Sequence, residues 1–239
     1  MVSCTFTIIF NKGTLRGKTM NYYISDLHLF HKNVVDEGRN FDHRPFKTLD
    51  EMHKKIIQNW NNTVTNADDV YILGDMLWRE TEEAIALTSI LKGRKHLIRG
   101  NHDRLRDIRY TTLFEEICDY KLIVDPDGGR NTKLVLCHYP IAFWNFQHGF
   151  RDNGVEAKNK AILLYGHVHA TKEWFIFENF LDELNKGGMG CEAYNVGCMM
   201  PYIDYTPRSL KEIREGFSEH QKDIEALKVK GQSVGVDYG

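Results

Sequence analysis

The stretch VYILGDMLWRETEEAIALTSILKGRKHLIRGNHD, residues 70–103, decides the fold class. It opens on a short apolar run over residues 70–73 that is typical of a buried strand, and a second such run covers residues 96–98. The residues between these runs carry a helical pattern from about 81 to 91, and Gly93 is placed to end the helix. A strand, a helix and a second strand in this order predict a βαβ unit, so we expect the sheet to be at least partly parallel.

The same alternation of apolar runs and helical stretches continues on both sides of this unit. We expect further buried strands at residues 22–24, 134–137, 162–165 and 174–177. A helix is expected to begin after Thr48 and to follow the i, i+3, i+4, i+7 pattern to Trp60, with Glu51 placed to complete a capping box. From Lys133 onward the strands follow one another more closely, as in a mixed or antiparallel sheet, and residues 209–230 form a charged helical stretch.

The composition is that of an ordinary globular protein. Hydrophobic residues make up 42% and charged residues 27% of the 239, which excludes a disordered or fibrous chain. Lys and Arg number 31 against 33 Asp and Glu, and this net charge of -2 argues against non-specific binding of nucleic acid. No apolar run approaches the roughly 18 residues of a membrane helix, so no membrane association is expected. The 5 cysteines are scattered without a C-x-x-C pair, which favours a reducing, cytoplasmic location.

We divide the chain into three parts. Residues 1–19 form an N-terminal extension that we expect to be dispensable, because Met20 stands directly before the first convincing core strand. Residues 20–215 form the one functional domain, and residues 216–239 form a charged C-terminal helix and tail.

Metal-ligating residue types recur where the predicted strands end. The runs that carry them are Asp26-Leu-His28, Gly74-Asp75, Gly100-Asn101-His102-Asp103, His138 and Gly166-His167-Val-His169. In open α/β sheets ligand sites gather outside the carboxyl ends of the strands, so we expect these side chains to converge on one cavity. The glycines in these runs fit sharp turns that bring backbone and ligands close to an ion.

The donor set indicates the kind of metal. Imidazole nitrogens with carboxylate and amide oxygens, and no thiolate, suit Mn²⁺, Fe²⁺, Zn²⁺, Ni²⁺ or Co²⁺ better than Mg²⁺ alone. The candidate ligands are too many for one ion: Asp26, His28, Asp75, Asn101, His138, His167 and His169. A bridging carboxylate fits two ions roughly 3.5–4 Å apart, and such a pair holds and deprotonates a water at neutral pH. Hydrolysis of a phosphate ester is the reaction that most needs this arrangement.

The order of these blocks, D-x-H, G-D, G-N-H-D, a lone His and then G-H-x-H, resembles the calcineurin-like metallophosphoesterases. It is most similar to the small bacterial and phage members, whose first block reads much like Ser25-Asp-Leu-His-Leu-Phe-His31-Lys-Asn33. The resemblance spans roughly residues 22–210. It implies an α/β fold in which two mixed β-sheets pack face to face as a sandwich flanked by helices, with the metals at one edge.

The resemblance also implies a role for each block. In this family the ligands divide between two ions. By resemblance, the first ion would be held by Asp26, His28 and His169, and the second by Asn101, His138 and His167. Asp75 would lie between the ions. A hydroxide that bridges the ions would attack phosphorus. His102 would be the catalytic residue that contacts the phosphate and protonates the leaving oxygen, a task that suits imidazole because its unperturbed pKa is close to working pH.

The blocks depart from the phosphatase branch of the family at two positions. That branch continues G-D-x-x-D-R-G, and its second aspartate steadies the catalytic histidine, whereas this chain has Trp78 at that place. The third block ends in Asp103 rather than glutamate. Both departures point away from a protein phosphatase, and they leave Asp103 or a backbone carbonyl as the partner of His102. The candidate substrate-binding residues are Arg79, His31, Asn33 and Asn101.

We therefore expect a metal-dependent hydrolase with a dinuclear centre that acts on phosphodiesters or small phosphorylated molecules, with Mn²⁺ as the first expected metal. A metal-dependent nuclease on short nucleic acids is a second hypothesis, which the balanced charge disfavours. A catalytically silent scaffold of the same fold that binds a protein partner is a third, and the presence of every ligand and of His102 argues against it. The oligomeric state stays open at this point.

Overall fold

A computed structural model describes residues 19–36, 38–39, 42, 44–126, 132–148 and 160–233. The predicted N-terminal extension, except for Thr19, lies outside the described residues, as does the end of the predicted tail.

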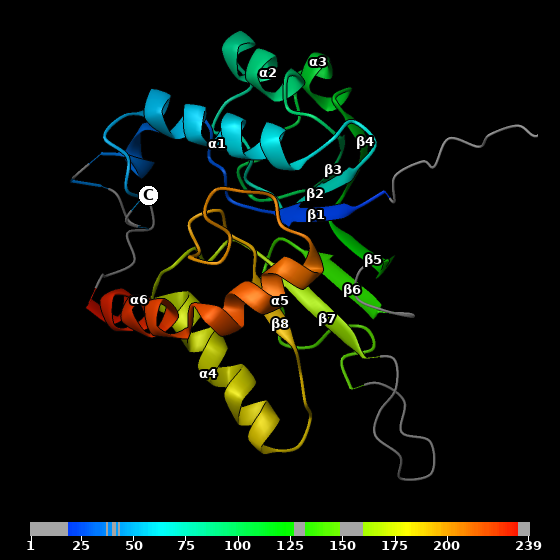
Figure 1. Ribbon diagram of the computed structural model, residues 1–239, viewed down its shortest axis with the longest axis vertical. Coiled ribbons are helices and arrows are strands. Elements are labelled where there is room, and N and C mark those ends of the chain that lie inside the picture. Colours follow the sequence, from blue (N-terminus) through cyan, green and yellow to red (C-terminus); the bar gives the residue numbers. More distant parts are fainter. Residues whose placement is uncertain are drawn as a thin grey trace, which may run out of the picture.

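The strands form two four-stranded sheets (Figure 1). The first has the order β1 (Asn21–Ile24), β2 (Asp69–Ile72), β3 (Arg94–Ile98) and β4 (Phe114–Cys118), and its neighbouring pairs run parallel. The second has the order β5 (Tyr120–Asp125), β6 (Thr132–Cys137), β7 (Ala161–Tyr165) and β8 (Ala193–Asn195), with β5 antiparallel to β6 and the other pairs parallel. An antiparallel bridge between Tyr23 and Arg208 extends the first sheet beyond β1. The α/β architecture with two sheets and flanking helices is confirmed. The second sheet is mixed as predicted, whereas the strand pairs of the first sheet are parallel and that isolated bridge is its antiparallel contact.

The predicted βαβ unit is β2, α2 (Glu82–Ser89) and β3. Its strands pair in parallel, with Val70 opposite Lys95, which confirms the parallel core of the first sheet. The helix is shorter than predicted, because Ile90 already caps it. Gly93 lies in the turn before β3 at φ +90°, where an added Cβ would stand 2.8 Å from Cγ1 of Val64. Gly93 therefore serves the turn into β3 and does not terminate the helix itself.

The first long helix, α1 (Leu49–Thr63), confirms the apolar pattern that predicted it. The Thr48 side chain accepts the backbone N–H of Glu51, as expected of an N-cap. The reciprocal half of the capping box is absent, because the Glu51 carboxylate accepts the N–H of Lys47 instead. A complete capping box is found at α5 (Leu210–Glu219), between Ser209 and Glu212.

The strand predicted at residues 174–177 is wrong, because these residues lie in α4 (Lys172–Lys186). Trp174, Phe177 and Leu181 are its buried side chains, and their spacing of three and four residues places them on one helical face. The charged stretch at residues 209–230 is helical as predicted, but it is divided at His220 into α5 and α6 (Gln221–Ser233). Two shorter elements complete the chain, the 3₁₀ helix η1 (Lys32–Val34) and α3 (Ile108–Thr111).

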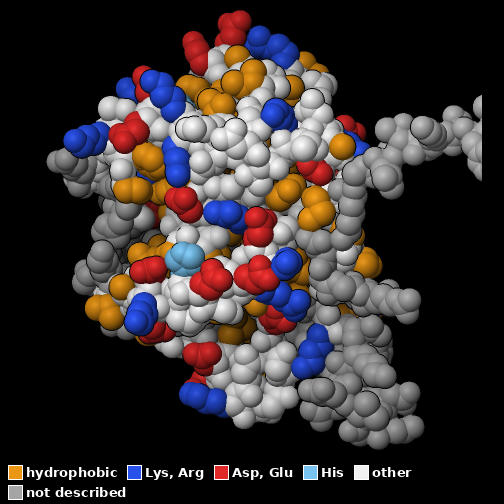
Figure 2. All heavy atoms as spheres, in the orientation of Figure 1, with side chains coloured by type: hydrophobic (Ala, Val, Ile, Leu, Met, Phe, Trp, Pro, Cys, Tyr) orange, Lys and Arg blue, Asp and Glu red, His pale blue; other side chains and the backbone are white. Residues whose placement is uncertain are grey.

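The two sheets meet in a common core. Tyr23 of β1 donates its hydroxyl to Asp125 of β5, so a buried hydrogen bond joins the sheets. In Figure 1, α1 and α2 lie beside the first sheet, and α4 lies beside the second on the opposite side of the molecule. Figure 2 shows basic and acidic side chains interspersed over one face of the protein, in keeping with the near-zero net charge. None of the helices in the described ranges combines the length and apolarity needed to cross a bilayer.

Candidate metal centre

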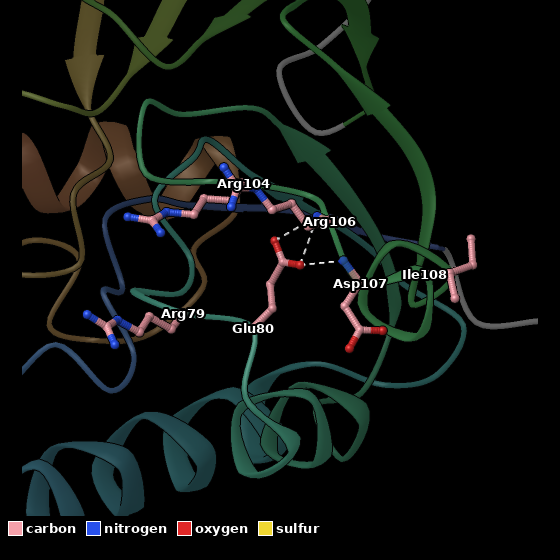
Figure 3. A pocket seen from close by; sticks show the side chains of 6 residues that line it. All are labelled: Arg79, Glu80, Arg104, Arg106, Asp107 and Ile108. Carbon is pink, nitrogen blue, oxygen red and sulfur yellow. Dashed lines mark hydrogen bonds between the residues drawn. The ribbon is translucent and has the colours of Figure 1, made fainter.

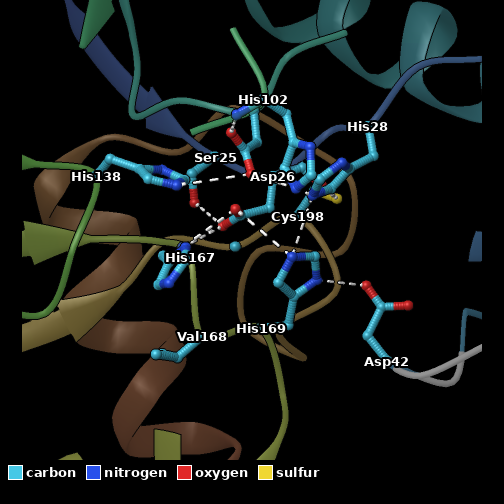
Figure 4. A network of polar contacts seen from close by, with 12 residues as sticks. Ser25, Asp26, His28, Asp42, His102, His138, His167, Val168, His169 and Cys198 are labelled. Carbon is cyan, nitrogen blue, oxygen red and sulfur yellow. Dashed lines mark hydrogen bonds and ion pairs between the residues drawn. The ribbon is translucent and has the colours of Figure 1, made fainter. Parts of the chain in front are cut away.

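The loops that follow five strands bring the predicted ligands to one place (Figure 4). Asp26 and His28 follow β1, Asp75 follows β2, Asn101 follows β3, His138 follows β6, and His167 and His169 follow β7. The donor atoms form two compact groups that share Asp26, one with His28 and His169 and one with Asp75 and His138. The strand-end argument therefore predicted the convergence correctly.

Asp75 lies at the middle of the cluster. Its Oδ2 is 3.5 Å from Nε2 of His28 and 3.6 Å from Nε2 of His138, so one carboxylate oxygen faces a ring from each predicted metal site. Burial, and then the negative charges of Asp26 and Asp103, raise the pKa of Asp75 to about 8. A buried carboxylate beside two others is a place where a bound cation relieves repulsion.

The first group joins Asp26, His28 and His169. Nε2 of His28 is 3.1 Å from Nε2 of His169. Nε2 of His169 is in turn 3.8 Å from Oδ1 of Asp26. The ring of His169 is fixed from behind, because its Nδ1 lies 2.8 Å from Oδ2 of Asp42. A carboxylate accepts hydrogen bonds, so Nδ1 of His169 donates to Asp42 and Nε2 is the ring nitrogen that faces His28 and Asp26.

The residues predicted for the second ion, Asn101, His138 and His167, lie beside Asp75. Oδ1 of Asn101 is 3.0 Å from Nε2 of His138 and 3.0 Å from Nδ1 of His167. His138 places its Nδ1 2.7 Å from the carbonyl oxygen of Leu73, which requires the proton on Nδ1 and leaves Nε2 as an acceptor.

This donor set fits divalent cations. Beside Asp75, ring nitrogens of His138 and His167 each lie 3.0 Å from the amide oxygen of Asn101, and Nε2 of His138 lies 3.6 Å from a carboxylate oxygen of Asp75. Burial also lowers the pKa of His28 and of His167, so both rings are neutral at pH 7, the form that binds a metal. Each anchored histidine also donates its remote N–H to a carboxylate or carbonyl, the support that metal-binding histidines usually receive.

A buried ion pair, Asp42 with Arg44, supports the first group and was missed by sequence reasoning. Nε of Arg44 donates to Asp42 at 2.9 Å, and its two other nitrogens donate to the carbonyls of Asp26 at 2.8 Å and Leu27 at 2.9 Å. Burial raises the pKa of Asp42, but Arg44 and His169 outweigh it and bring the pKa to about 2. The D-x-R spacing in the connection after η1 carries no signal by which sequence alone identifies this role.

Asp103 does not partner His102, contrary to one of our two expectations. Its carboxylate accepts three backbone N–H groups, from Asp75 at 2.8 Å, Gly100 at 2.8 Å and Met76 at 3.2 Å. Asp103 thus ties the turn after β2 to the turn after β3 and holds Asp75 and its neighbours in position.

The rings of Trp78 and His28 lie beside His102, and the carboxylate nearest in this arrangement is that of Asp75. The ring centroid of Trp78 lies 5.1 Å from that of His102 and 3.9 Å from that of His31. Nε2 of His102 is 4.0 Å from Oδ2 of Asp75, and its backbone N–H donates to Oδ1 of the same residue. His31 lies beside the cluster, with its ring centroid 5.7 Å from that of His28, and its contact with substrate stays a prediction.

The other two predicted substrate contacts lie farther out. Arg79 is exposed and shares a small cavity with Trp78 and His102. Asn33 lies in η1 and is half-buried, and within the described residues no contact joins it to the predicted ligands. Its assignment as a substrate-binding residue stays a prediction.

Close backbone packing explains the glycines of the motifs. A Cβ on Gly74, which has φ +85°, would stand 2.3 Å from Nδ1 of His138. A Cβ on Gly166 would stand 2.4 Å from Oγ of Ser25 and 2.5 Å from Oδ2 of Asp26. No side chain fits at either position without displacing a predicted ligand or the residue beside it.

Comparison with known proteins agrees with this geometry. A family model for the calcineurin-like phosphoesterase superfamily domain matches residues 22–207, which lie inside the predicted domain at residues 20–215. An uncharacterized protein of Methanocaldococcus jannaschii is 36% identical over 109 residues, which are 45% of this chain and 59% of that protein. The Gene 66 protein of Mycobacterium phage D29 is 35% identical over 171 residues, covering 62% of this chain and 78% of the phage protein.

A solved structure shares the architecture. A protein of unknown function from Aquifex aeolicus, AQ665, superimposes with a TM-score of 0.56 at 25% identity, over 82% of this chain and 98% of that one. The family match covers most of the chain, and its range includes every strand-end block that builds the cluster. This chain belongs to the calcineurin-like phosphoesterase superfamily.

Proposed function

We propose that this protein is a dinuclear metal-dependent phosphoesterase that acts on phosphodiesters or small phosphorylated molecules. The observation that carries the proposal is the place of Asp75 Oδ2, which lies 3.5 Å from a ring nitrogen of His28 and 3.6 Å from one of His138. A carboxylate oxygen placed between two groups of donors is the feature that two neighbouring ions require.

The proposed metals are two divalent transition ions, with Mn²⁺ first and Fe²⁺, Zn²⁺, Ni²⁺ or Co²⁺ as further candidates. The residues that would hold them are Asp26, His28 and His169 on one side and Asn101, His138 and His167 on the other, with Asp75 between. Bound there, the ions would supply a water-derived nucleophile and neutralise charge on the phosphoryl group.

His102 is the residue we propose to act on the leaving oxygen. Its side chain is 35% exposed, so it reaches both the cluster and solvent. Burial, followed by the nearby His138 and His169, lowers the pKa of His102 in the free protein. A phosphate anion bound beside the ring favours the protonated form, which then donates to the departing oxygen.

Trp78 is proposed to orient this ring by packing, in place of the carboxylate of the phosphatase branch. Ring packing fixes the plane of His102 without adding a negative charge, and burial lowers the pKa of this ring although the nearby Asp26 carboxylate raises it. His31, on the other face of Trp78, would border the bound ester.

The test is the turnover of bis-p-nitrophenyl phosphate and p-nitrophenyl phosphate by protein stripped with chelator and reloaded with Mn²⁺. We expect metal-dependent turnover, two bound ions per chain by elemental analysis, and loss of both turnover and bound metal in Asp75→Asn. His102→Ala should keep the metal and lose turnover, whereas replacing the exposed His148 with alanine is the matched control. Wild-type metal content and turnover in Asp75→Asn would refute the proposal.

Two other functions are separated by the same measurements. A silent scaffold would hold the metals and turn over neither ester, and His102→Ala would then leave every readout unchanged. A nuclease on short nucleic acids would prefer the diester over the monoester. This function is favoured by a cleft lined by Arg79, Arg104 and Arg106, which is described below.

A further inference from the structure

An arginine-lined cleft lies beside the metal centre (Figure 3). It is a cavity of about 700 Å³ formed by the loop after β3 and the residues that follow Trp78. Its lining residues are Arg79, Glu80, Arg104, Arg106, Asp107 and Ile108. The volume falls in the range of pockets that hold small organic ligands, roughly 300–1,000 Å³.

The arginine cleft adjoins the surroundings of His102. A smaller cavity is lined by Trp78 and His102 and also by Arg79 and Arg104, which line the cleft as well. A substrate held with its reacting ester at His102 would therefore extend toward the arginines.

The acidic residues of the cleft are already occupied. The Glu80 carboxylate accepts the backbone N–H of Arg106 at 2.8 Å and that of Asp107 at 2.6 Å. Asp107 binds the guanidinium of Arg109, outside the cleft lining, at 2.7 Å. Both carboxylates thus shape the loop. Asp107 is paired with Arg109 and Glu80 keeps its charge, so the lining has three arginines against one carboxylate that no cation pairs.

The three lining arginines, Arg79, Arg104 and Arg106, are exposed, and no acidic partner for their side chains is found in the described part of the chain. Figure 3 shows the three side chains extending in the same direction from the two sides of the cleft. Like charges gathered in one cavity repel unless an anion lies among them, and a planar guanidinium matches phosphate oxygens in pairs. This local positive charge contrasts with the net charge of -2 for the whole chain.

We propose that the arginine cleft binds a second phosphate of the substrate, so that the preferred substrates are phosphodiesters carrying a further phosphate beyond the ester that is cut. The inference rests on the proposed phosphoesterase function and names its substrate class. Short oligonucleotides are such substrates. Nucleoside polyphosphates also present a second phosphate, through an anhydride bond and not a diester, and the experiment has an arm for each.

The first measurement compares two p-nitrophenyl esters that differ by one phosphate: thymidine 5′-(p-nitrophenyl phosphate) and the same ester with a 3′-phosphate. We expect the 3′-phosphorylated ester to have a kcat/KM about tenfold higher, the value of one charge-assisted contact at a partly exposed site. Arg104→Gln and Arg106→Gln should each reduce this ratio to about threefold or less. The ratio is insensitive to changes at the metal centre, because both esters present the same reacting bond.

The matched control is Arg94→Gln, at the opposite end of β3, where the arginine is paired with Asp69 outside the cleft. It should keep the tenfold ratio. An equal kcat/KM for both esters in the wild type, or a ratio that survives in Arg104→Gln and in Arg106→Gln, would overturn the proposal.

The second measurement needs no turnover, so it separates failure of the cleft from failure of the proposed function. Chelator-treated protein is titrated into fluorescein-labelled dithymidylate with and without a terminal phosphate, and the anisotropy is followed. Tighter binding of the phosphorylated form, lost in the two arginine variants, supports the cleft even when neither ester is hydrolysed. Equal binding of both forms by the wild type contradicts it.

Displacement then assigns the source of the second phosphate. Preferential displacement of the labelled dinucleotide by unlabelled phosphorylated dithymidylate indicates an oligonucleotide strand, whereas preferential displacement by thymidine diphosphate indicates adjacent phosphates. Displacement by neither at concentrations that saturate the wild-type protein would overturn the assignment of the cleft to phosphate.

Discussion

Replacing Arg44 with methionine should destabilise the protein and loosen the metal centre together. The Arg44 side chain has no exposed surface, and neither has that of its partner Asp42. Methionine fills much of the same volume, but it leaves the Asp42 carboxylate without its cation. The substitution also removes the donors to the backbone carbonyls of Asp26 and Leu27. Asp26 is the first predicted ligand along the chain.

The size of the effect follows from burial. Removing one partner of a buried ion pair costs about 3–5 kcal/mol, because an uncompensated charge is left in the interior. For a chain of this length that corresponds to a fall in the midpoint of thermal unfolding of about 6–20 °C. The exposed pair of Arg99 and Asp119 has the same chemistry in solvent, so Arg99→Met should cost no more than about 1 kcal/mol.

The assay is urea unfolding of chelator-treated protein at pH 7, followed by tryptophan fluorescence, so that bound metal does not contribute to stability. A cycle with Asp42→Asn isolates the pair, and the double variant should be less destabilised than the sum of the two single variants, by about 1–3 kcal/mol. Isothermal titration with Mn²⁺ should show about 10–100-fold weaker binding by Arg44→Met. A loss of stability as small as that of Arg99→Met, or strict additivity in the cycle, would refute this account of the ion pair.

Three further changes test other parts of the structure. Trp78→Ala should lower kcat for bis-p-nitrophenyl phosphate about tenfold at unchanged metal content, because His102 loses the ring that orients it; a matching loss of metal would contradict this reading. Asp69 accepts from an arginine and a histidine of β3, which outweigh its burial and lower its pKa below the value in the unfolded chain. The ionised Asp69 carboxylate therefore stabilises the folded protein above about pH 4, and this stabilisation is lost as the pH falls through the lowered pKa. In urea unfolding, the free energy of unfolding of the wild type should exceed that of Asp69→Asn by about 1 kcal/mol at pH 7, and this difference should shrink toward pH 2. Gly166→Ala would place a Cβ 2.5 Å from Oδ2 of Asp26, and elemental analysis should find its metal content well below that of the wild type.

The strands that sequence predicted are those buried on both faces. β6 and β7 read as continuous apolar runs because helices and the other sheet exclude water from both sides. β5 was missed because it is an edge strand whose alternate side chains meet solvent, with Val124 58% exposed. β8 has only three residues, too few for any period to be read.

The error at residues 174–177 has a related cause. Four consecutive apolar residues fit a buried strand and a buried helix equally well, and only a longer window separates them. Extending the window to Leu181 adds the helical spacing, and the residues after Phe177 supply the length that a strand between two loops does not have.

The predicted ligands were found because each follows its strand within a few residues, so local sequence and sheet topology together fix where they lie. Asp42 and Arg44 lie in the connection between η1 and α1, and only the folded path of that connection brings them to His169 and Asp26. The role of Asp103 was misread for the same reason. Adjacency to His102 in sequence suggested a contact, whereas its carboxylate turns toward the backbone of Asp75.

The backbone at the centre opposes local preference, which is why no propensity scale reveals it. Five predicted ligands are non-glycine residues in the left-handed region: Asp26 at φ 55°, His28 at 45°, Asp75 at 53°, His167 at 70° and His169 at 48°. Each such conformation costs about 1 kcal/mol or more and persists only where the surroundings impose it. Here the imposing contacts come from the protein itself, from Arg44 on the carbonyls after β1 and from Asp103 on the amides after β2. Since these contacts involve no donor atom of the predicted metal sites, Arg44 and Asp103 fix the backbone at Asp26 and at Asp75 through groups that an ion would not use.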